Sequence, residues 1–369
     1  TVQNATAEPA GIHLPYNETY LNNWTRMDPW PVSRTNANMV YDRSDGVMIL
    51  FGGTVWPNLG TNETWTYNLS TNRWRNMNPA KTLPADSPGY NMVFDSIDSV
   101  VILFETVYSS AQGNTWTYNL SANTWNQLNP FPAPNGRTGA SMCFDSKDGV
   151  VVFFGGSWGG GINDTWTYNL TANAWTKKAP AVTPSPRTGA GMAYDPVSDK
   201  IILFGGQDDT GSILGDTWSY ELKTDTWTNR TPASSPPART MDNKNMQYDP
   251  IRGEPIIFGG IGQDWTFLCD TWGYDRISNT WTQINTANTP SIRPNAACAY
   301  DTGHGGLVLF GGYGDYAYWD ETWFCNSTTA GWTNENIAPS YRGMSRMVYD
   351  DTHERFILFG GANWAEPFL

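Results

Sequence analysis

The chain repeats one pattern seven times: an apolar run that ends in Phe at the same register. Gly-Gly follows the run in six copies, and only the second copy differs, with Glu105-Thr106 in that place. The runs end 49 to 54 residues apart, at Phe51, Phe104, Phe154, Phe204, Phe258, Phe310 and Phe359. A unit of this length cannot bury its own faces and must stack on its neighbours. The repeat therefore predicts one array of similar units before any chemistry is considered.

The third copy shows what one unit contains. Residues 138–145 alternate as a strand, 146–149 form a tight turn, and 150–154 are a wholly apolar strand. After a loop, 164–170 alternate as a third strand, and a fourth strand begins at 174. Four antiparallel strands per repeat are typical of one blade of a β-propeller. We therefore predict an all-β chain of seven four-stranded blades, with strands A to D in chain order.

A pair of Trp residues marks strands C and D of the first six copies. These pairs are Trp65 and Trp74, Trp116 and Trp125, Trp166 and Trp175, Trp218 and Trp227, Trp272 and Trp281, and Trp323 and Trp332. Tyr20 and Trp24 stand at the N-terminal end, with no A and B strands before them. Segment 17–30 is thus predicted to complete the blade begun by 343–361, which would close the ring and remove an open edge. Residues 17–369 would form a single seven-bladed propeller, with 1–16 as an N-terminal extension.

Gly-Gly after an apolar strand, followed by an aromatic pair, resembles the kelch repeat. The resemblance covers nearly the whole chain and recurs in all its copies. It implies a kelch-type β-propeller fold. Kelch propellers include scaffolds, glycan-modifying enzymes and copper oxidases, so the resemblance alone does not choose a function.

Composition restricts the partners and the compartment that we expect. The formal net charge is −13, which argues against nucleic acid and anionic membrane surfaces as partners. No run of 18 apolar residues is present to span a bilayer. The sequence starts at Thr1 rather than Met, which fits a mature protein after removal of its signal and equally a trimmed or incomplete sequence; we expect an extracellular or cell-surface location. Its four Cys residues are too few to hold the fold together, and we expect mostly buried, unpaired thiols.

Strand A carries a sulfur-containing residue at one position in every copy. The position holds Met39, Met92, Met142, Met192, Met246, Cys298 and Met347. Such a ring could be read as a soft-metal site. We expect blade-to-blade packing instead, because Met is an adaptable apolar side chain and its burial is worth roughly 1.5–3 kcal/mol.

An Arg enters strand A in six copies, and an acid begins strand C in six. The cations are Arg34, Arg137, Arg187, Arg239, Arg293 and Arg342, and the acids are Glu63, Asp164, Asp216, Asp270, Glu321 and, for the closing blade, Glu18. Because strands A, B and C alternate in direction, both residues lie at one end of a blade. The Arg can reach the acid across Gly-Gly. The sequence therefore favours structural ion pairs, with an anion site at the channel mouth as the alternative.

The second copy supports the ion-pair interpretation. Ser87 replaces the Arg, Asn114 replaces the acid, and Glu105-Thr106 replaces Gly-Gly. All three features are lost together, as parts of one linked unit would be.

Aromatic residues gather in the long B–C loops and on the C-terminal tail. They are Trp56, Tyr108, Trp158, Trp265, Phe267, Tyr313, Tyr316, Tyr318, Trp319 and Trp364. Exposed aromatic clusters mark sugar-stacking sites or protein interfaces. The alternative is that these residues cover the blade ends. We predict non-enzymatic recognition or assembly through this face, with a glycan, a protein or other copies of the chain as partner.

Enzyme interpretations have weak support. The positions of His13, His304 and His353 in the sequence suggest no catalytic triad or copper ligand set, so we predict no catalytic site, no metal and no cofactor. Acids in the loops could pair for acid–base chemistry, which leaves a carbohydrate-active enzyme as the alternative function. These acids are Asp208, Asp209, Asp264, Asp315 and Asp320.

Ten Asn-x-Ser/Thr sequons suggest glycosylation. They are at Asn4, Asn17, Asn23, Asn62, Asn68, Asn119, Asn163, Asn169, Asn229 and Asn326. Three of them, Asn68, Asn119 and Asn169, fall in predicted C–D turns, where Asn also suits the backbone. We predict that some of the ten carry glycans.

Overall fold

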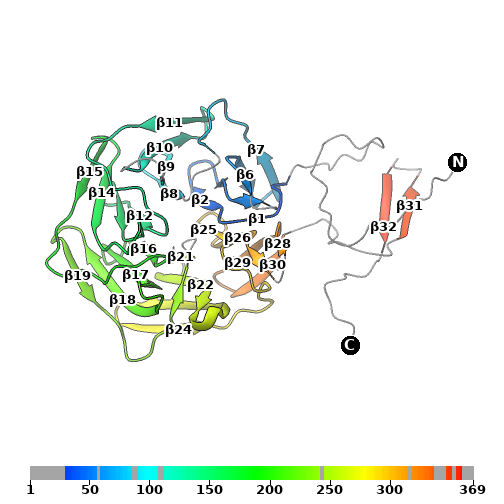
Figure 1. The fold of residues 1–369 in the computed structure, drawn as a ribbon. Coiled ribbons are helices and arrows are strands. Elements are labelled where there is room, and N and C mark those ends of the chain that lie inside the picture. The colour runs from blue at the N-terminus through cyan, green and yellow to red at the C-terminus, as the bar shows by residue number, and fades with distance from the viewer. Residues whose placement is uncertain are drawn as a thin grey trace.

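The computed structural model shows a ring of four-stranded antiparallel blades around a central axis (Figure 1). It describes residues 30–55, 59–84, 90–106, 112–241, 245–314, 317–335, 346–350 and 355–359. In every blade strand A lies nearest the axis and strand D lies outermost. No helix among these residues is long and apolar enough to cross a bilayer. The predicted all-β propeller of four-stranded blades is confirmed.

Six blades are complete within the described residues, and their strands follow in chain order. Blade 1 comprises β2 (Asn38–Asp42), β3 (Val47–Phe51), β6 (Thr64–Asn68) and β7 (Arg73–Asn76), and blade 2 comprises β8 (Tyr90–Asp95), β9 (Val100–Glu105), β10 (Asn114–Asn119) and β11 (Thr124–Leu128). Blade 3 comprises β12 (Ser141–Asp145), β13 (Val150–Phe154), β14 (Thr165–Asn169) and β15 (Ala174–Lys177), and blade 4 comprises β16 (Gly191–Asp195), β17 (Lys200–Gln207), β18 (Ile213–Glu221) and β19 (Thr226–Asn229). Blade 5 comprises β21 (Met246–Asp249), β22 (Glu254–Gly262), β23 (Phe267–Asp275) and β24 (Thr280–Ile284), and blade 6 comprises β25 (Ala297–Asp301), β26 (Gly306–Phe310), β29 (Thr322–Asn326) and β30 (Gly331–Asn334).

Several short elements lie in the loops and linkers between the strands of the blades. They are β1 (Arg34–Thr35), β4 (Thr54–Val55), β5 (Leu59–Gly60), β20 (Arg239–Thr240), β27 (Tyr313–Gly314), β28 (Ala317–Tyr318) and the 3-10 turn η1 (Gln263–Trp265). Strands B and C are longest in blades 4 and 5, where the register shifts after Phe204 and after Phe258. Such bulges bend a strand and increase its twist. Beyond these bulges the hairpins β17–β18 and β22–β23 continue, and the extended part of β22 also pairs with β20.

The hydrophobic core lies between blades. Ile49 and Phe51 of blade 1 are buried with Met92 and Leu103 of blade 2, and the other clusters also join two blades. The Met position of strand A belongs to these clusters in the six complete blades. Packing, rather than metal binding, accounts for it where side chains are described; Met347 lies outside them.

The repeated Phe has a defined partner at each interface. Its ring lies against the strand-D Trp of the next blade, with centroids 4.8 Å apart for Phe51 and Trp125 and 4.7 Å apart for Phe310 and Trp74. The indole Nε1 of that Trp donates to a strand-C Thr of the preceding blade, as Trp125 does to Thr64 at 2.9 Å. The same bond recurs from Trp175, Trp227, Trp281 and Trp74. One aromatic contact and one buried hydrogen bond thus tie a blade to its predecessor at five of the six interfaces.

The first blade packs directly on the sixth. Strands β2 and β25 lie side by side, and Trp74 Nε1 donates to Thr322 Oγ1 at 3.0 Å. The six blades therefore close the ring without an intervening sheet (Figure 1). The equivalent pair between blades 5 and 6 does not meet, because Trp332 Nε1 and Thr271 Oγ1 are buried without hydrogen-bond partners.

The seventh copy contributes the two-stranded hairpin β31 (Arg346–Asp350) and β32 (Arg355–Phe359). Of the segment predicted to complete it, all but residue 30 lies outside the described residues, as does the extension 1–16. A seventh blade between the first and sixth is therefore not seen in the described part of the chain. The reason is that all copies present the same faces, so blade 1 can accept the sixth copy as it would accept a seventh.

Candidate functional site

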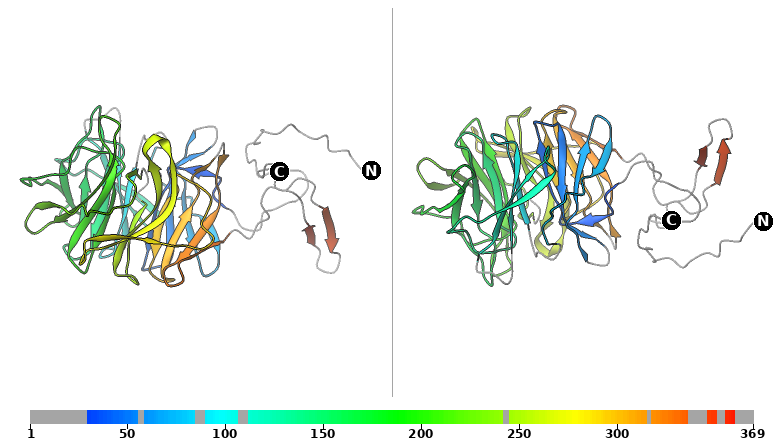
Figure 2. Two further views of the ribbon diagram at one scale, coloured as in Figure 1. Left: turned by 90° about the horizontal axis from the view of Figure 1, so that it is seen from below. Right: turned by 90° about the horizontal axis from the view of Figure 1, so that it is seen from above.

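Connections of two kinds divide the ring into two ends (Figure 2). We call the end with the A–B and C–D turns the turn end, and the end with the B–C loops and D–A linkers the loop end. At the turn end, a strand-A Asp accepts two backbone amides of its own A–B turn, as Asp145 does from Lys147 and Asp148. Strand-C Tyr side chains donate to the C–D turns, as Tyr168 does to Asn173 at 2.9 Å. The turn end is therefore stiffened by local bonds.

At the loop end the structure brings five predicted Arg–acid pairs together. Arg34 Nη2 lies 2.6 Å from Glu63, Arg187 Nη1 2.6 Å from Asp216, and Arg293 Nη2 2.8 Å from Glu321. Arg239 lies 2.6 Å from Asp270, and Arg137 bonds Asp164. The five Arg residues are at most 4% exposed. Arg342 and Glu18 lie outside the described residues.

Gly-Gly makes room for these pairs. Arg137 Nη1 donates to the Gly155 carbonyl at 3.2 Å, and its Nε donates to the Asn135 carbonyl at 3.0 Å. A Cβ on Gly156 would lie 3.0 Å from the Cγ and Cδ atoms of Arg137, so a side chain there would collide with the Arg stem. The acid also accepts the strand-C indole, as Asp164 does from Trp166 Nε1 at 2.8 Å. The guanidinium groups therefore bond protein acceptors, except that Nη1 of Arg293 is buried without a hydrogen-bond partner, and this favours structural ion pairs over the alternative of an anion site.

Burial and pairing act in opposite directions on the pKa values of Arg34, Asp216 and Asp270. Burial lowers the pKa of the Arg34 guanidinium, although the neighbouring Glu63 acts in the opposite direction. Burial alone would raise the pKa of Asp216, but hydrogen bonds and the charge of Arg187 outweigh it and the pKa is lowered. The same balance lowers the pKa of Asp270 beside Arg239. Both carboxyl groups are therefore held in their charged form.

The second blade departs from the pattern in a way that the sequence did not reveal. Its carboxylate is moved rather than lost: Glu105 of strand B is 2% exposed and accepts from Trp116 Nε1 at 2.8 Å and from Asn114 Nδ2 at 3.0 Å. No Lys or Arg of the described residues pairs with Glu105. Ser87 lies outside those residues. The signal was present in the sequence, because an acid in place of the first Gly can reach the indole from the neighbouring strand.

The predicted loop-end aromatics divide into exposed and covered groups. Trp265 is 74% exposed, and Trp158 and Tyr313 are each 39% exposed. Phe267, Tyr318 and Trp319 are half-buried. The Tyr313 and Tyr318 rings meet edge to face, and the Arg293 guanidinium lies 5.2 Å from the Trp319 ring centre. Trp56, Tyr108, Tyr316 and Trp364 lie outside the residues whose side chains are described. Cover of the blade ends thus accounts for part of the set, and it does not account for Trp265.

The B–C loops of blades 3, 4 and 5 form one connected surface. Gly161 N of blade 3 donates to Asp209 of blade 4, and Ile213 N of blade 4 donates to Gln263 Oε1 of blade 5 at 3.4 Å. Trp265 stands at the tip of the last loop with φ of 61°, and Asp264 before it has φ of 57°. Two consecutive non-Gly residues in the left-handed region carry backbone strain, which gathers at functional sites.

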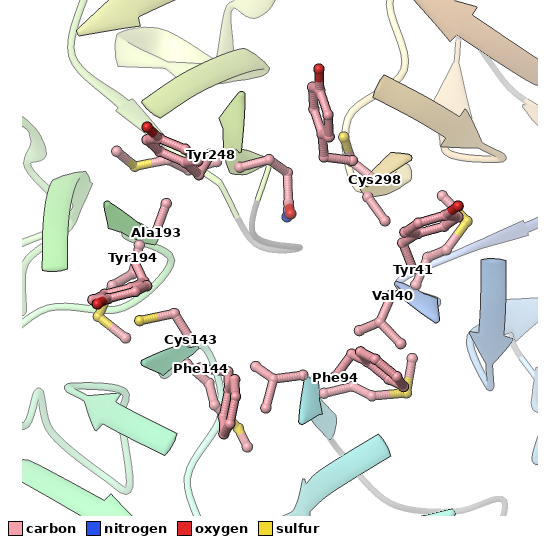
Figure 3. Close-up of a pocket in the computed structure, with 18 of the residues that line it drawn as sticks. Val40, Tyr41, Phe94, Cys143, Phe144, Ala193, Tyr194, Tyr248 and Cys298 are labelled. Carbon is pink, nitrogen blue, oxygen red and sulfur yellow. The ribbon is translucent and has the colours of Figure 1, made fainter. Parts of the chain in front are cut away.

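A cavity of about 360 Å³ lies on the axis of the ring, among the A strands (Figure 3). Val40 and Ala193 face this space, and the rings of Tyr41, Phe94 and Tyr194 stand around it. The lining is mixed, with Met and other apolar side chains beside polar residues such as Arg43 and Gln247. Cys143 and Cys298 are among the lining residues, and no Asp or Glu is among them.

Other acidic residues of the described part either bond their own loops or lie outside the lining of the axial cavity. Asp208 accepts from Thr210 and Ser212 of its own loop, which holds the pKa of its carboxyl below the usual range. Asp145, Asp148 and Asp199 lie together at the turn end, where Lys147 bonds Asp199. Asp264 lies beside Trp265, and Asp315 lies outside the described residues.

One histidine of the described residues lies between a serine and an aspartate in a Ser-His-Asp series, which the sequence did not lead us to expect. His304 Nδ1 lies 2.8 Å from Asp301 and its Nε2 lies 2.7 Å from Ser70, both at the turn end. His13 and His353 lie outside the described residues. None of the four Cys residues forms a disulfide within the described residues; Cys143, Cys298 and Cys325 are buried and Cys269 is exposed. Burial, with Cys325 nearby, raises the pKa of the Cys298 thiol to about 12.

Fold and site together define a rigid propeller that displays variable loops at one end. The chain matches the family model described as KLHDC2/KLHL20/DRC7 Kelch-repeats domain, over residues 12–183 and 178–361. It therefore belongs to the kelch-repeat family. Domains of this family generally bind proteins and are typically not enzymes.

Proposed function

We propose that this chain is a non-enzymatic recognition module outside the cell, which binds a protein through the connected B–C loops of blades 3, 4 and 5. One observation carries the proposal: Trp265 is 74% exposed and stands on a strained loop tip. An apolar ring of this size is costly to leave in water, and Trp is enriched among the residues that dominate binding energy.

The scaffold below Trp265 suits such a role. Strands β22 and β23 pair up to Ile261 and Phe267, so the loop rests on a continuous hairpin rather than on a free segment. The neighbouring loops are joined to it by hydrogen bonds. A preorganised surface loses less conformational entropy on binding, which favours affinity.

The loop-end acids do not favour the alternative of a carbohydrate-active enzyme. Asp208 caps its own loop and Asp209 bonds the Gly161 amide, so neither is aimed with a second acid at a shared cavity. A sugar ligand remains an outcome of the test, because an exposed indole also stacks on sugars.

A photoreactive side chain in place of Trp265 tests the proposal. The purified chain carrying benzoylphenylalanine at this position is irradiated with secreted proteins from its natural source. The matched control carries the probe in place of Ile277, which is 84% exposed in the C–D turn of blade 5. We expect a discrete adduct with one polypeptide at position 265 only. Adducts to carbohydrate, equal adducts at both positions, or none at 265 would contradict the proposal.

The hairpin β31–β32 favours a second partner, another copy of the chain. It pairs with no third strand among the described residues, and isolated two-stranded sheets are marginal in water. Strands from the same chain or from a neighbour could complete it. Light scattering of native material distinguishes the two, because a neighbour would give multiples of the mass of one chain with its glycans, or ordered arrays, and self-completion would give a monomer.

A further inference from the structure

Four sequons occupy equivalent positions at the turn end. Asn68, Asn119, Asn169 and Asn326 are the last residues of β6, β10, β14 and β29, and each begins a C–D turn. Their Oδ1 atoms accept the backbone amide three residues later, at 2.9, 2.8, 2.7 and 3.0 Å. No hydrogen bond in the described part of the chain uses their Nδ2 atoms. The side-chain oxygen thus fixes the Asn in place, while the nitrogen that glycosylation modifies makes no hydrogen bond among the described residues.

Two other sequons have the opposite arrangement. Asn62 Nδ2 donates to Thr82 Oγ1 at 3.0 Å and to the Leu83 carbonyl at 2.8 Å. Asn163 Nδ2 donates to Thr183 Oγ1 at 2.9 Å and to the Pro184 carbonyl at 3.4 Å. Each nitrogen has only two hydrogens, and both are used to fasten the D–A linker. A glycan would replace one hydrogen and push the linker away, so the folded chain disfavours it.

Asn229 resembles the first group, although it lies at the loop end. It is exposed, its Oδ1 accepts from Thr231 N at 2.9 Å, and its Nδ2 is likewise unused among the described contacts. Asn4, Asn17 and Asn23 lie outside the described residues.

The four turn-end sequons fall on consecutive blades around the ring. They belong to blades 6, 1, 2 and 3, whereas Glu221 and Asp275 hold the same position in blades 4 and 5. The C–D turn joins the two outermost strands, so a glycan there stands at the rim (Figure 1). We propose that Asn68, Asn119, Asn169 and Asn326 carry N-linked glycans that cover the turn-end rim of four blades and leave the rim of blades 4 and 5 bare.

Glycans on the turn-end rim of four consecutive blades would restrict where another protein can contact the ring. Strand D is the open edge of each blade, and bulky hydrated chains beside it hinder edge-to-edge pairing. Blades 4 and 5 are bare only at the turn end: their loop end carries Trp265 and the sequon at Asn229, and the C–D turn of blade 5 exposes Ile277. A partner approaching blades 4 and 5 therefore meets no turn-end glycan. This inference requires passage through a secretory compartment, but it is independent of whether Trp265 binds a protein.

Site occupancy in the native protein tests the inference. The chain is digested after Glu and before Asp, which separates Asn62 from Asn68 at Glu63 and Asn163 from Asn169 at Asp164. Unmodified peptides are quantified against isotope-labelled synthetic standards. We expect less than about half of the Asn68, Asn119, Asn169 and Asn326 peptides to be unmodified, and the Asn62 and Asn163 peptides to be recovered in full. Unmodified peptides at the four rim sites, or equal modification of Asn62 and Asn163, would overturn it.

A variant separates the glycan from the turn. Thr171→Ala removes the sequon of Asn169 but keeps the Asn169 Oδ1 bond to Ala172 N. We expect the intact mass to fall by one glycan while the far-ultraviolet spectrum stays unchanged, with Thr171→Ser as the control that retains the glycan. An unchanged glycan mass in the Ala variant would also overturn the assignment.

Discussion

At the loop end, each buried Arg is neutralised by a single acidic residue. Each Arg–acid pair combines a guanidinium that is almost fully buried with a carboxylate that is partly exposed. Breaking such a pair costs more than the pair contributes, because the remaining charge is left without a partner. The contribution of each ion pair to stability can therefore be measured only against a carboxylate that has no Arg partner. Glu105 of blade 2 is such a carboxylate among the described residues.

Asp164→Asn should lower the free energy of unfolding by about 2–4 kcal/mol, because it leaves Arg137 buried without a full counter-charge. The matched control is Glu105→Gln, which keeps an acceptor for Trp116 and strands no cation among the described residues. We expect the control to change stability by less than about 1 kcal/mol. Urea unfolding of both variants measures the difference, and equal losses would refute the ion-pair account.

The lowered pKa of Asp216 gives the ion pairs a pH signature. A carboxyl with a depressed pKa in the folded state stabilises above its unfolded pKa of about 3.9, and this stabilisation is lost as the pH falls through the folded value. Asp216→Asn should therefore be less stable than the natural chain at about pH 7, and the gap should narrow below about pH 4. Unfolding free energies measured across this range check the result, and a gap independent of pH would contradict it.

Interfaces between blades are the next level of organisation. The Phe that ends strand B and the Trp of the next strand D meet at all six interfaces, including the one between blades 6 and 1. The buried Trp–Thr hydrogen bond is formed at five of them and is missing between blades 5 and 6. The elements are thus equivalent in sequence but not in the bonds they complete.

A pair of conservative substitutions tests the interface bond. Thr64→Val removes the acceptor of Trp125 Nε1 and leaves a buried donor unsatisfied, which should cost about 1–3 kcal/mol. Thr271→Val removes a hydroxyl that is already buried without a partner, so it should be neutral or slightly stabilising. Thermal unfolding compares the two variants. Equal destabilisation would show that the bond between Trp332 and Thr271 forms in solution.

Across the whole molecule, the features that recur from repeat to repeat could be predicted from the sequence, whereas departures of single blades from the repeat could not. The Arg–acid pairs followed from strand direction alone, since the start of strand A and the start of strand C must share one end. Glu105 was missed because its side chain replaces the acid from a different strand. Trp265 was predicted to be a loop residue, but its strained backbone depends on the hairpin beneath it.

The repeat pattern could not predict which blade packs against blade 1 to close the ring. Seven copies are present, yet equivalent faces allow blade 1 to meet blade 6, as Trp74 and Phe310 do. Counting repeats therefore predicts how many units a chain has, and not which unit packs beside the first. The completion of β31–β32 remains a question of which strands reach it, from the same chain or from a second copy.

The function rests on Trp265 as the anchor of a protein interface. Calorimetric titration with the polypeptide that crosslinks at this position tests it most directly. Trp265→Ala should weaken binding about 30-fold or more, which is roughly 2 kcal/mol, while Ile277→Ala should leave the affinity unchanged. Both variants should unfold at the temperature of the natural chain. Unchanged affinity after Trp265→Ala, or equal losses in the two variants, would contradict the account.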